Sequence, residues 1–193
     1  MTLQAGTLRD DLRRVLLSPE AATRLEVRGR SDAAVLVALY VQDDQLHAVF
    51  TERRDDLPRH AGEISFPGGR YEANDADLRT TALREAQEEI GLPPDAVEIV
   101  GALQPTPTIV TGYSVYPFVG LIEPGRLWTL SPREVAQVLE LPLAALLAGY
   151  ARRRLIRRGL PIRTDTYLVG SHLIWGATAR ILADLFDRIG PLI

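Results

Sequence analysis

The pattern of apolar and polar positions predicts alternating strands and helices along the chain. A nearly continuous apolar run is typical of a buried strand, whereas apolar residues recurring every three or four positions are typical of an amphipathic helix. We therefore expect strands at residues 33–41, 46–53, 97–103, 114–122 and 134–141, with a β-hairpin over residues 151–168. We expect helices at residues 7–17, 77–90, 142–147 and 171–189. Mixed strands with helices on both sides predict the α/β class, as an α/β/α sandwich around a mixed sheet with N-terminal and C-terminal helices.

Turn-forming residues mark the connections between these elements. Asp43-Asp44 reads as a tight turn, and residues 57–69 as a loop rich in Pro, Gly and His. The prolines of residues 105–108 argue against regular structure there. No linker is long enough to divide the chain. We therefore expect a helical extension at residues 1–30 and one structural domain at residues 31–193.

Composition and charge narrow the class of protein. The chain has 193 residues, of which 46% are apolar and 24% charged, as in ordinary globular proteins. A net charge of −3 argues against a non-specific nucleic-acid binder. The N-terminus carries no signal-like pattern, and no apolar run approaches the roughly 18–20 residues that span a bilayer. We expect a cytoplasmic protein with neither a nucleic-acid nor a membrane partner.

Two residue types are missing from the chain, and both absences restrict its chemistry. Without cysteine there are no disulfides, thiolate nucleophiles or cysteine-based metal sites. All 22 basic residues are arginine, so lysine Schiff bases and lysine phosphate loops are excluded. Any fixed cationic contact to a phosphate must therefore come from arginine, which can bind it bidentately.

An acidic group on one predicted helix is the strongest candidate site. Glu85, Glu88 and Glu89 have the spacing i, i+3, i+4, which places them on one helix face. Like charges at this spacing repel, and a hard divalent cation such as Mg²⁺ or Mn²⁺ would offset the repulsion. A solvated acidic helix face is the better explanation of the three glutamates when they are considered alone.

The flanking residues favour the metal site over a solvated face. A turn that excludes bulky side chains, Phe66-Pro67-Gly68-Gly69, precedes the helix. Gly91 follows it, at the position where a left-handed backbone commonly ends a helix.

Together these features resemble the signature of Nudix hydrolases, matched by Gly69 and by residues 84–92. The resemblance implies the Nudix fold and metal-dependent hydrolysis of a nucleoside diphosphate linked to another moiety. Glu85 and Glu89 would be direct metal ligands, with Glu88 a third or water-mediated ligand, and Gly69 would contribute its backbone carbonyl. Arg84 would orient a glutamate.

One stretch departs from the common signature. Its first glutamate is best matched by Asp75, but one extra residue separates Asp75 from Arg84. The insertion weakens any role for Asp75 and leaves the helix unaffected.

With this insertion, the sequence resembles the coenzyme A diphosphatase branch of the family. The positions that fit this branch are Thr51, Arg53, Leu57, His60, Gly62, Glu63, residues 66–69, Glu72, Asp75 and residues 81–89. Arg54 stands where that branch has a serine, and Arg59 lies one place beyond its second arginine. The resemblance implies cleavage of coenzyme A, or a derivative, to 3′,5′-ADP and 4′-phosphopantetheine.

The remaining site candidates are assigned by their place in these motifs. Arg53, Arg54 and Arg59 are candidate ligands of a substrate phosphate, and His60 either joins them or holds the loop. The general base is a helix glutamate, Glu134 or Glu63.

Other interpretations of the motif remain open. One is a broader nucleoside diphosphate-sugar pyrophosphatase of the ADP-ribose type, and another is a Nudix-fold binding or regulatory module without catalysis. The apolar C-terminal helix could serve a homodimer. The number of metal ions, the phosphorus attacked and the preferred form of coenzyme A are open as well.

Overall fold

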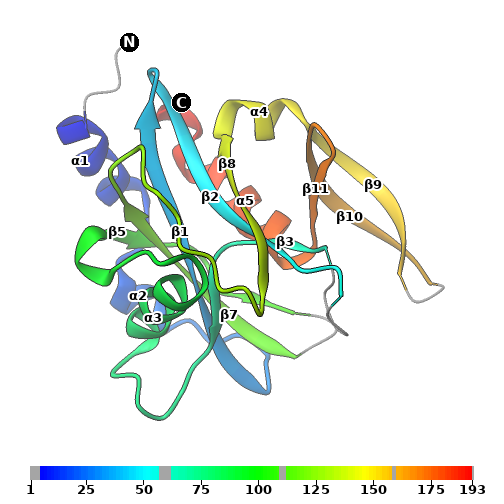
Figure 1. The fold of residues 1–193 in the computed structure, drawn as a ribbon, viewed down its shortest axis with the longest axis horizontal. Helices are drawn as coiled ribbons and strands as arrows, with labels where there is room; N and C mark the ends of the chain where they lie inside the picture. The colour runs from blue at the N-terminus through cyan, green and yellow to red at the C-terminus, as the bar shows by residue number, and fades with distance from the viewer. Residues whose placement is uncertain (1–4, 57–61, 109–111, 158–159, 193) are drawn as a thin grey trace.

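An eight-stranded mixed sheet forms the centre of the computed structural model, which describes residues 5–56, 62–108, 112–157 and 160–192 (Figure 1). Its strands are β1 (Ser31–Gln42), β2 (Gln45–Arg53), β3 (Ile64–Ser65), β4 (Gly68–Arg70), β5 (Glu98–Ala102), β6 (Thr106–Pro107), β7 (Tyr113–Leu121) and β8 (Val135–Pro142). The main path runs β3-β2-β1-β7-β5, with β4 on β1, β6 on β7 and β8 on β2. The β1–β7 ladder is parallel and the others are antiparallel, so the sheet is mixed, as predicted.

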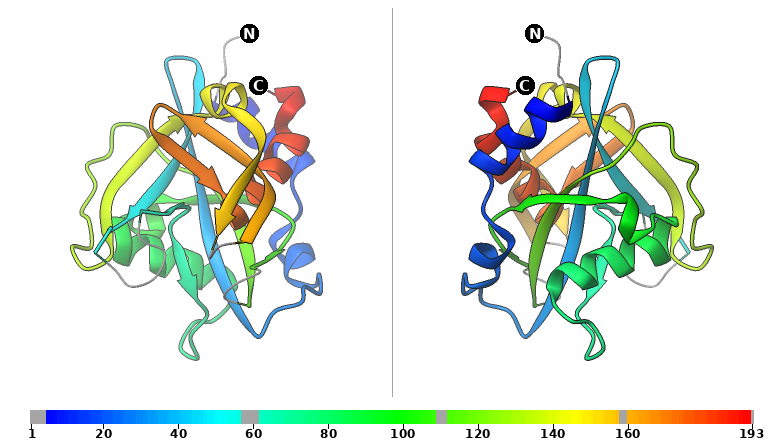
Figure 2. Two further views of the ribbon diagram at one scale, coloured as in Figure 1. Left: turned by 90° about the vertical axis from the view of Figure 1, so that its right-hand side faces the viewer. Right: turned by 90° about the vertical axis from the view of Figure 1, so that its left-hand side faces the viewer.

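Helices cover both faces of this sheet, which confirms the predicted α/β/α arrangement. On one face lie α2 (Pro19–Thr23) and α3 (Leu78–Ile90), whose buried residues share a core cluster with β1 and β7. On the other face lie α1 (Ala5–Val15), α4 (Leu143–Ala148) and α5 (Gly176–Ile189). Figure 2 shows α3 on one side of the strands and α1 beside α5 on the other. Short 3₁₀ turns at η1 (Pro94–Ala96) and η2 (Gly190–Leu192) complete the helical elements.

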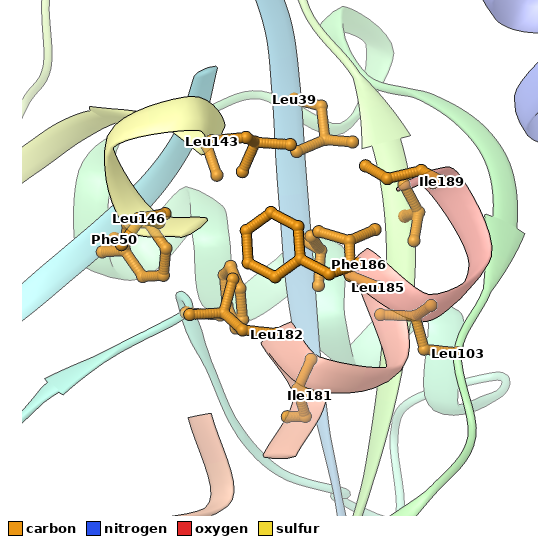
Figure 3. Packing of buried hydrophobic residues seen from close by; sticks show 14 of the residues in the cluster. Leu39, Phe50, Leu103, Leu143, Leu146, Ile181, Leu182, Leu185, Phe186 and Ile189 are labelled. Atoms are coloured by element: carbon orange, nitrogen blue, oxygen red, sulfur yellow. The ribbon is translucent and has the colours of Figure 1, made fainter. Parts of the chain in front are cut away.

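The larger core lies between the sheet and α5. Leu182, Leu185 and Phe186 of α5 point toward Leu39 of β1 and Phe50 of β2 (Figure 3). The apolar positions of α5 recur at helical spacing and are buried, with Leu182 and Leu185 fully inaccessible to solvent. The C-terminal helix therefore packs into the same hydrophobic core as the sheet.

A second, three-stranded sheet projects from the main body near the C-terminus (Figure 1). It consists of β9 (Tyr150–Arg157), β10 (Leu160–Val169) and β11 (His172–Trp175), in the order β11-β10-β9. The predicted hairpin over residues 151–168 is confirmed by the β9–β10 ladder, although its turn at residues 158–159 lies outside the described residues.

Two local predictions were wrong, both because of pairing between strands. The last helix was expected from residue 171, but His172–Trp175 pairs with Thr166–Val169 and α5 starts at Gly176. Residues 105–108 were expected to be irregular, yet Thr106–Pro107 pairs with Ser114–Val115 as a two-residue strand. In both cases the partner strand supplies hydrogen bonds that the local pattern does not reveal.

None of the helices in the described segments combines the length and the apolar character needed to cross a bilayer.

Candidate active site

Helix α3 begins and ends close to the positions predicted from sequence. Asp77 is its N-cap and accepts a hydrogen bond from the Thr80 N–H at 2.7 Å. Gly91 ends the helix in the left-handed conformation, with φ of 68°. The side chains of Ala82, Ala86 and Ile90 are buried against the sheet. The glutamates occupy other faces of the same helix.

The Gly-Gly turn lies directly against two of these glutamates. Gly69 of β4 pairs with Ala34 of β1, which fixes the turn beside α3. A Cβ on Gly69 would sit 2.4 Å from the carboxyl carbon of Glu85, so any other residue here would displace the Glu85 carboxylate. The Gly68 N–H donates to Oε2 of Glu89 at 3.2 Å. The structure therefore brings together the turn and the helix glutamates that the motif singled out.

Burial gives these two carboxyl groups unusual proton affinities. Burial raises the pKa of Glu89 to about 8, although the hydrogen bond from the Gly68 N–H acts to lower this pKa. The negative charges of Glu85 and Glu134 add to the rise. Burial also raises the pKa of Glu85, while the neighbouring Arg84 opposes that change. Partly buried carboxylates that are costly to ionise are a suitable environment for a cation, which would favour their charged form. Oxygen donors of this kind fit Mg²⁺ or Mn²⁺.

Glu88 is placed differently from its two neighbours. Its side chain is 60% exposed and lies 3.3 Å from Nη1 of Arg84. In the parts of the chain that are described, no three His, Asp or Glu side chains are gathered closely enough to hold a metal. Mg²⁺ commonly binds through one or two carboxylates and completes its shell with water and substrate phosphate oxygens. Glu85, Glu89 and the Gly69 carbonyl would suffice for such a site.

Arg84 connects the acidic helix to the loop before it. Its Nη1 donates to Oε1 of Glu85 at 3.0 Å, which is the type of contact expected from the motif. Its Nε donates to Oδ1 of Asp75 at 2.9 Å, and its Nη2 to Oδ2 of the same carboxylate at 3.1 Å. The hydrogen bonds from Arg84 hold the pKa of Asp75 well below its usual range, although burial acts in the opposite direction.

The inference against a role for Asp75 was therefore wrong. The buried Asp75 carboxylate also accepts hydrogen bonds from the Thr81 hydroxyl at 2.8 Å and the Glu72 N–H at 3.0 Å. The extra residue is accommodated in the loop, so the bond to Arg84 forms despite the changed spacing. Asp75 holds Arg84, and Arg84 in turn contacts Glu85.

A loop from the far end of the sheet brings Glu134 to the same place. The N–H groups of Thr129 and Ser131 donate to the carbonyls of Ile90 and Glu89, at 3.1 and 2.8 Å. Glu134 follows this docked segment, and its charge contributes to the raised pKa values of Glu85 and Glu89. The sequence offered Glu134 as a candidate base at the start of a strand, without showing that it reaches the glutamates of α3. The last carbonyls of α3, which need hydrogen-bond partners, were the signal that something docks there.

The predicted phosphate ligands have different surroundings. Nη1 of Arg53 lies 3.4 Å from Oε2 of Glu134, and the positive charge of Arg53 lowers the pKa of Glu89. The Arg54 guanidinium instead bonds Asp56 twice, at 2.8 and 2.7 Å, and donates to the Pro132 carbonyl at 2.6 Å. Both arginines therefore contact groups of the chain itself, Arg53 at Glu134 and Arg54 at Asp56 and Pro132.

The other loop candidates are only partly described. The Glu63 carbonyl accepts the Arg53 N–H at 3.0 Å. The Glu63 backbone therefore lies beside Arg53, whose side chain contacts Glu134. Arg59 and His60 lie outside the described residues.

Comparison with protein-family models matches a NUDIX domain to residues 30–158, which is more than half of the chain. The chain belongs to the Nudix family. Nudix hydrolases act on pyrophosphate bonds and generally use a divalent cation such as Mg²⁺ or Mn²⁺. The Nudix hydrolase NudL of Salmonella paratyphi B is 42% identical over 167 residues, which cover 86% of each chain. Its counterpart in Salmonella newport matches equally well.

Solved Nudix structures share the fold at low sequence identity. A MutT/nudix family protein from Enterococcus faecalis covers 99% of this chain and 76% of its own, with a TM-score of 0.57 and 15% identity. The NUDIX domain of Shewanella oneidensis NrtR, solved with ADP ribose, covers 76% of this chain and 88% of its own, with a TM-score of 0.50 and 18% identity. At these identities the likeness supports the fold alone.

Proposed function

We propose that this Nudix protein hydrolyses the diphosphate bridge of coenzyme A or its derivatives, with Mg²⁺ or Mn²⁺, to 3′,5′-ADP and 4′-phosphopantetheine. The observation that supports it best is the contact of Gly68 and Gly69 with Glu89 and Glu85. That contact joins the coenzyme A-type loop motif, residues 51–69, to the acidic helix.

The cation would be held by Glu85, Glu89 and the Gly69 carbonyl, with Glu88 joining directly or through water. When bound, it supplies charge neutralisation and Lewis acidity at the diphosphate. Arg84 fixes Glu85 through the 3.0 Å hydrogen bond, and Asp75 fixes Arg84. This chain of contacts orients one ligand before substrate arrives, so little reorganisation is needed.

Hydrolysis requires a group that takes a proton from the attacking water. Glu134 is the favoured base, because its docked loop brings its charge close to Glu85 and Glu89 while its side chain stays 52% exposed. Water attacks one phosphorus, the bond to the bridging oxygen breaks, and the proton passes to the Glu134 carboxylate. Glu63 is the second candidate, from the opposite loop. Arg53 is positioned to neutralise a phosphate oxygen.

The proposal is tested by incubating the purified protein with coenzyme A and Mg²⁺ and separating the products by chromatography. We expect 3′,5′-ADP and 4′-phosphopantetheine in equal amounts. Glu89→Gln should reduce turnover by more than about 100-fold, as loss of a metal ligand does at least as much damage as loss of its supporting shell. Glu123→Gln, which alters an exposed glutamate away from the site, is the matched control.

Two alternative functions give different results in the same assay. Good turnover of ADP-ribose without turnover of coenzyme A would identify a broader nucleoside diphosphate-sugar pyrophosphatase. The NrtR domain solved with ADP ribose makes that substrate the right comparison. No turnover of either substrate, together with no Mg²⁺ or Mn²⁺ binding by calorimetry, would identify a binding or regulatory module instead.

A further inference from the structure

A groove of about 550 Å³ lies beside the turn that holds Glu134. None of Glu85, Glu89 and Glu134 lines it. Its volume falls within the roughly 300–1,000 Å³ of small-molecule sites, but it is open to solvent, so a ligand would lie along it and would not be enclosed. Four of its lining residues are apolar and come from the docked loop and the start of β8: Leu130, Pro132, Val135 and Ala136. The groove can therefore bury apolar surface of a ligand.

Among the described residues, the remaining wall of the groove carries net negative charge. It consists of Arg54, Asp55 and Asp56. The Arg54 guanidinium is matched by Asp56 through two hydrogen bonds, and a third N–H is directed to the Pro132 carbonyl. Asp55 is left as the excess charge. A phosphate would be repelled here, whereas a neutral group with N–H or O–H donors would be accepted.

Residues that line the groove adjoin Glu134, the proposed base, along the chain. Pro132 and Val135 flank Glu134, and the Arg54 N–H donates to the Glu134 carbonyl at 3.1 Å. Opposite Arg53 the β2–β8 ladder shifts register, and Val135 becomes the partner of Arg53. Such irregularities redirect side chains at the rim of a site. A substrate with its diphosphate at Glu85 and Glu89 could extend an attached chain past Glu134 into the groove.

We propose that this groove binds the pantetheine arm of coenzyme A and thereby sets substrate preference. The inference rests on the proposed function and names the part of the substrate that distinguishes it from nucleoside diphosphate sugars. The arm is an uncharged chain with two amides, a hydroxyl and a terminal thiol. Its methyl and methylene groups cover the apolar floor, and its N–H and O–H groups donate to Asp55. The same negative charge directs the 3′-phosphate elsewhere.

The test measures binding of the two halves of coenzyme A and therefore does not depend on turnover. 4′-Phosphopantetheine and 3′,5′-ADP are each titrated into the full chain with Mg²⁺ by calorimetry. Ala136 is exposed at the groove, and Ala136→Phe fills part of it. We expect this variant to weaken 4′-phosphopantetheine at least about tenfold more than 3′,5′-ADP, since occluding a pocket contact of this size has effects of roughly 10–200-fold.

Two further variants make the result decisive. Ala21→Phe places the same side chain on the exposed face of α2 and should leave both affinities as in the wild type. Asp55→Ala removes the excess charge without filling the groove, and should also weaken 4′-phosphopantetheine selectively. It provides the answer if Ala136→Phe fails to fold.

Three outcomes would overturn the assignment of the groove: no binding of 4′-phosphopantetheine to the wild type, equal losses for both halves, or no loss in either groove variant. The proposed function fails separately, if the wild type binds 4′-phosphopantetheine selectively in the groove yet does not cleave coenzyme A. Turnover of coenzyme A with unchanged affinities in both groove variants would retain the function and reject the groove.

Discussion

At the residue scale, Gly69 determines how closely the backbone can approach a carboxylate. The 2.4 Å between its hypothetical Cβ and the Glu85 carboxyl carbon is too short for any side chain. The same closeness would let the Gly69 carbonyl and Glu85 share one cation.

Gly69→Ala should therefore displace Glu85 and weaken Mn²⁺ binding by about 10–100-fold, while the cost in stability stays within about 1–3 kcal/mol. Calorimetric titration with Mn²⁺ and thermal denaturation measure the two effects. Gly6→Ala is the control, because nothing lies within 4 Å of the added Cβ. Wild-type Mn²⁺ affinity in Gly69→Ala would contradict the proposed ligand arrangement.

The raised pKa of Glu89 makes the stability of the metal-free protein depend on pH. In the unfolded chain a glutamate ionises near pH 4.3, whereas burial raises the pKa of folded Glu89 to about 8. Between these values the unfolded state releases a proton that the folded state retains. The free energy of unfolding should therefore fall as pH rises through this window and level off above it.

Glu89→Gln should remove most of this dependence. In EDTA at pH 8 the variant should be more stable than the wild type by at least about 1 kcal/mol, since one pKa unit corresponds to about 1.4 kcal/mol. Saturating Mn²⁺ should reverse the order, because it stabilises only the protein that retains the ligand. Urea denaturation of both proteins at pH 5.5 and pH 8, with and without metal, measures these free energies of unfolding. A wild type that stays more stable than the variant in EDTA at pH 8 would exclude a cost of ionising Glu89 in the folded state.

At the scale of elements, the loop before α3 is held to the helix by one buried carboxylate. Asp75 has a side-chain exposure of only 4% and bonds Arg84, Thr81 and the Glu72 N–H. Its removal leaves donors on both the loop and the helix without their partner.

Asp75→Ala should lower the free energy of unfolding by about 1–3 kcal/mol, or more because one partner is charged. It should also reduce turnover, since Arg84 loses the contact that orients it toward Glu85. Asp95→Ala, in the short 3₁₀ turn η1, is the control, because Asp95 is exposed. Urea denaturation and coenzyme A turnover provide the two measurements. An effect on stability alone would make Asp75 a purely structural residue.

At the scale of the whole molecule, the C-terminal helix and the central sheet share one core. Leu182 of α5 is fully buried near Phe50 of β2 (Figure 3), and both belong to the same cluster as Tyr167 of β10. A shared core predicts that the main body and the C-terminal sheet unfold together.

Leu182→Ala should cost about 2–5 kcal/mol, and this loss should appear in both parts of the molecule. Trp128 lies in the loop that docks on α3, and Trp175 ends β11, so single-tryptophan versions report on each part separately. Their fluorescence transitions in urea should coincide, and should shift by the same amount when Leu182 is truncated. Separate transitions would divide the chain into two folding units and contradict the predicted single domain.

The sequence by itself determined the features that depend only on residues close together along the chain. The spacing of the three glutamates follows the helical repeat and so places them on one helix. Asp77 caps the start of that helix and Gly91 ends it, both through local backbone preferences. The Gly68-Gly69 turn could also be identified locally, because only glycine tolerates such close contact.

Tertiary structure decided which distant groups join that helix. The Glu134 loop docks on the end of α3, and β11 replaces the first predicted turn of α5, through hydrogen bonds to partners far away along the chain. Asp75 reaches Arg84 because the loop between them can absorb an extra residue. Local spacing encodes none of these contacts, since each forms only when the folded chain brings its separated segments together.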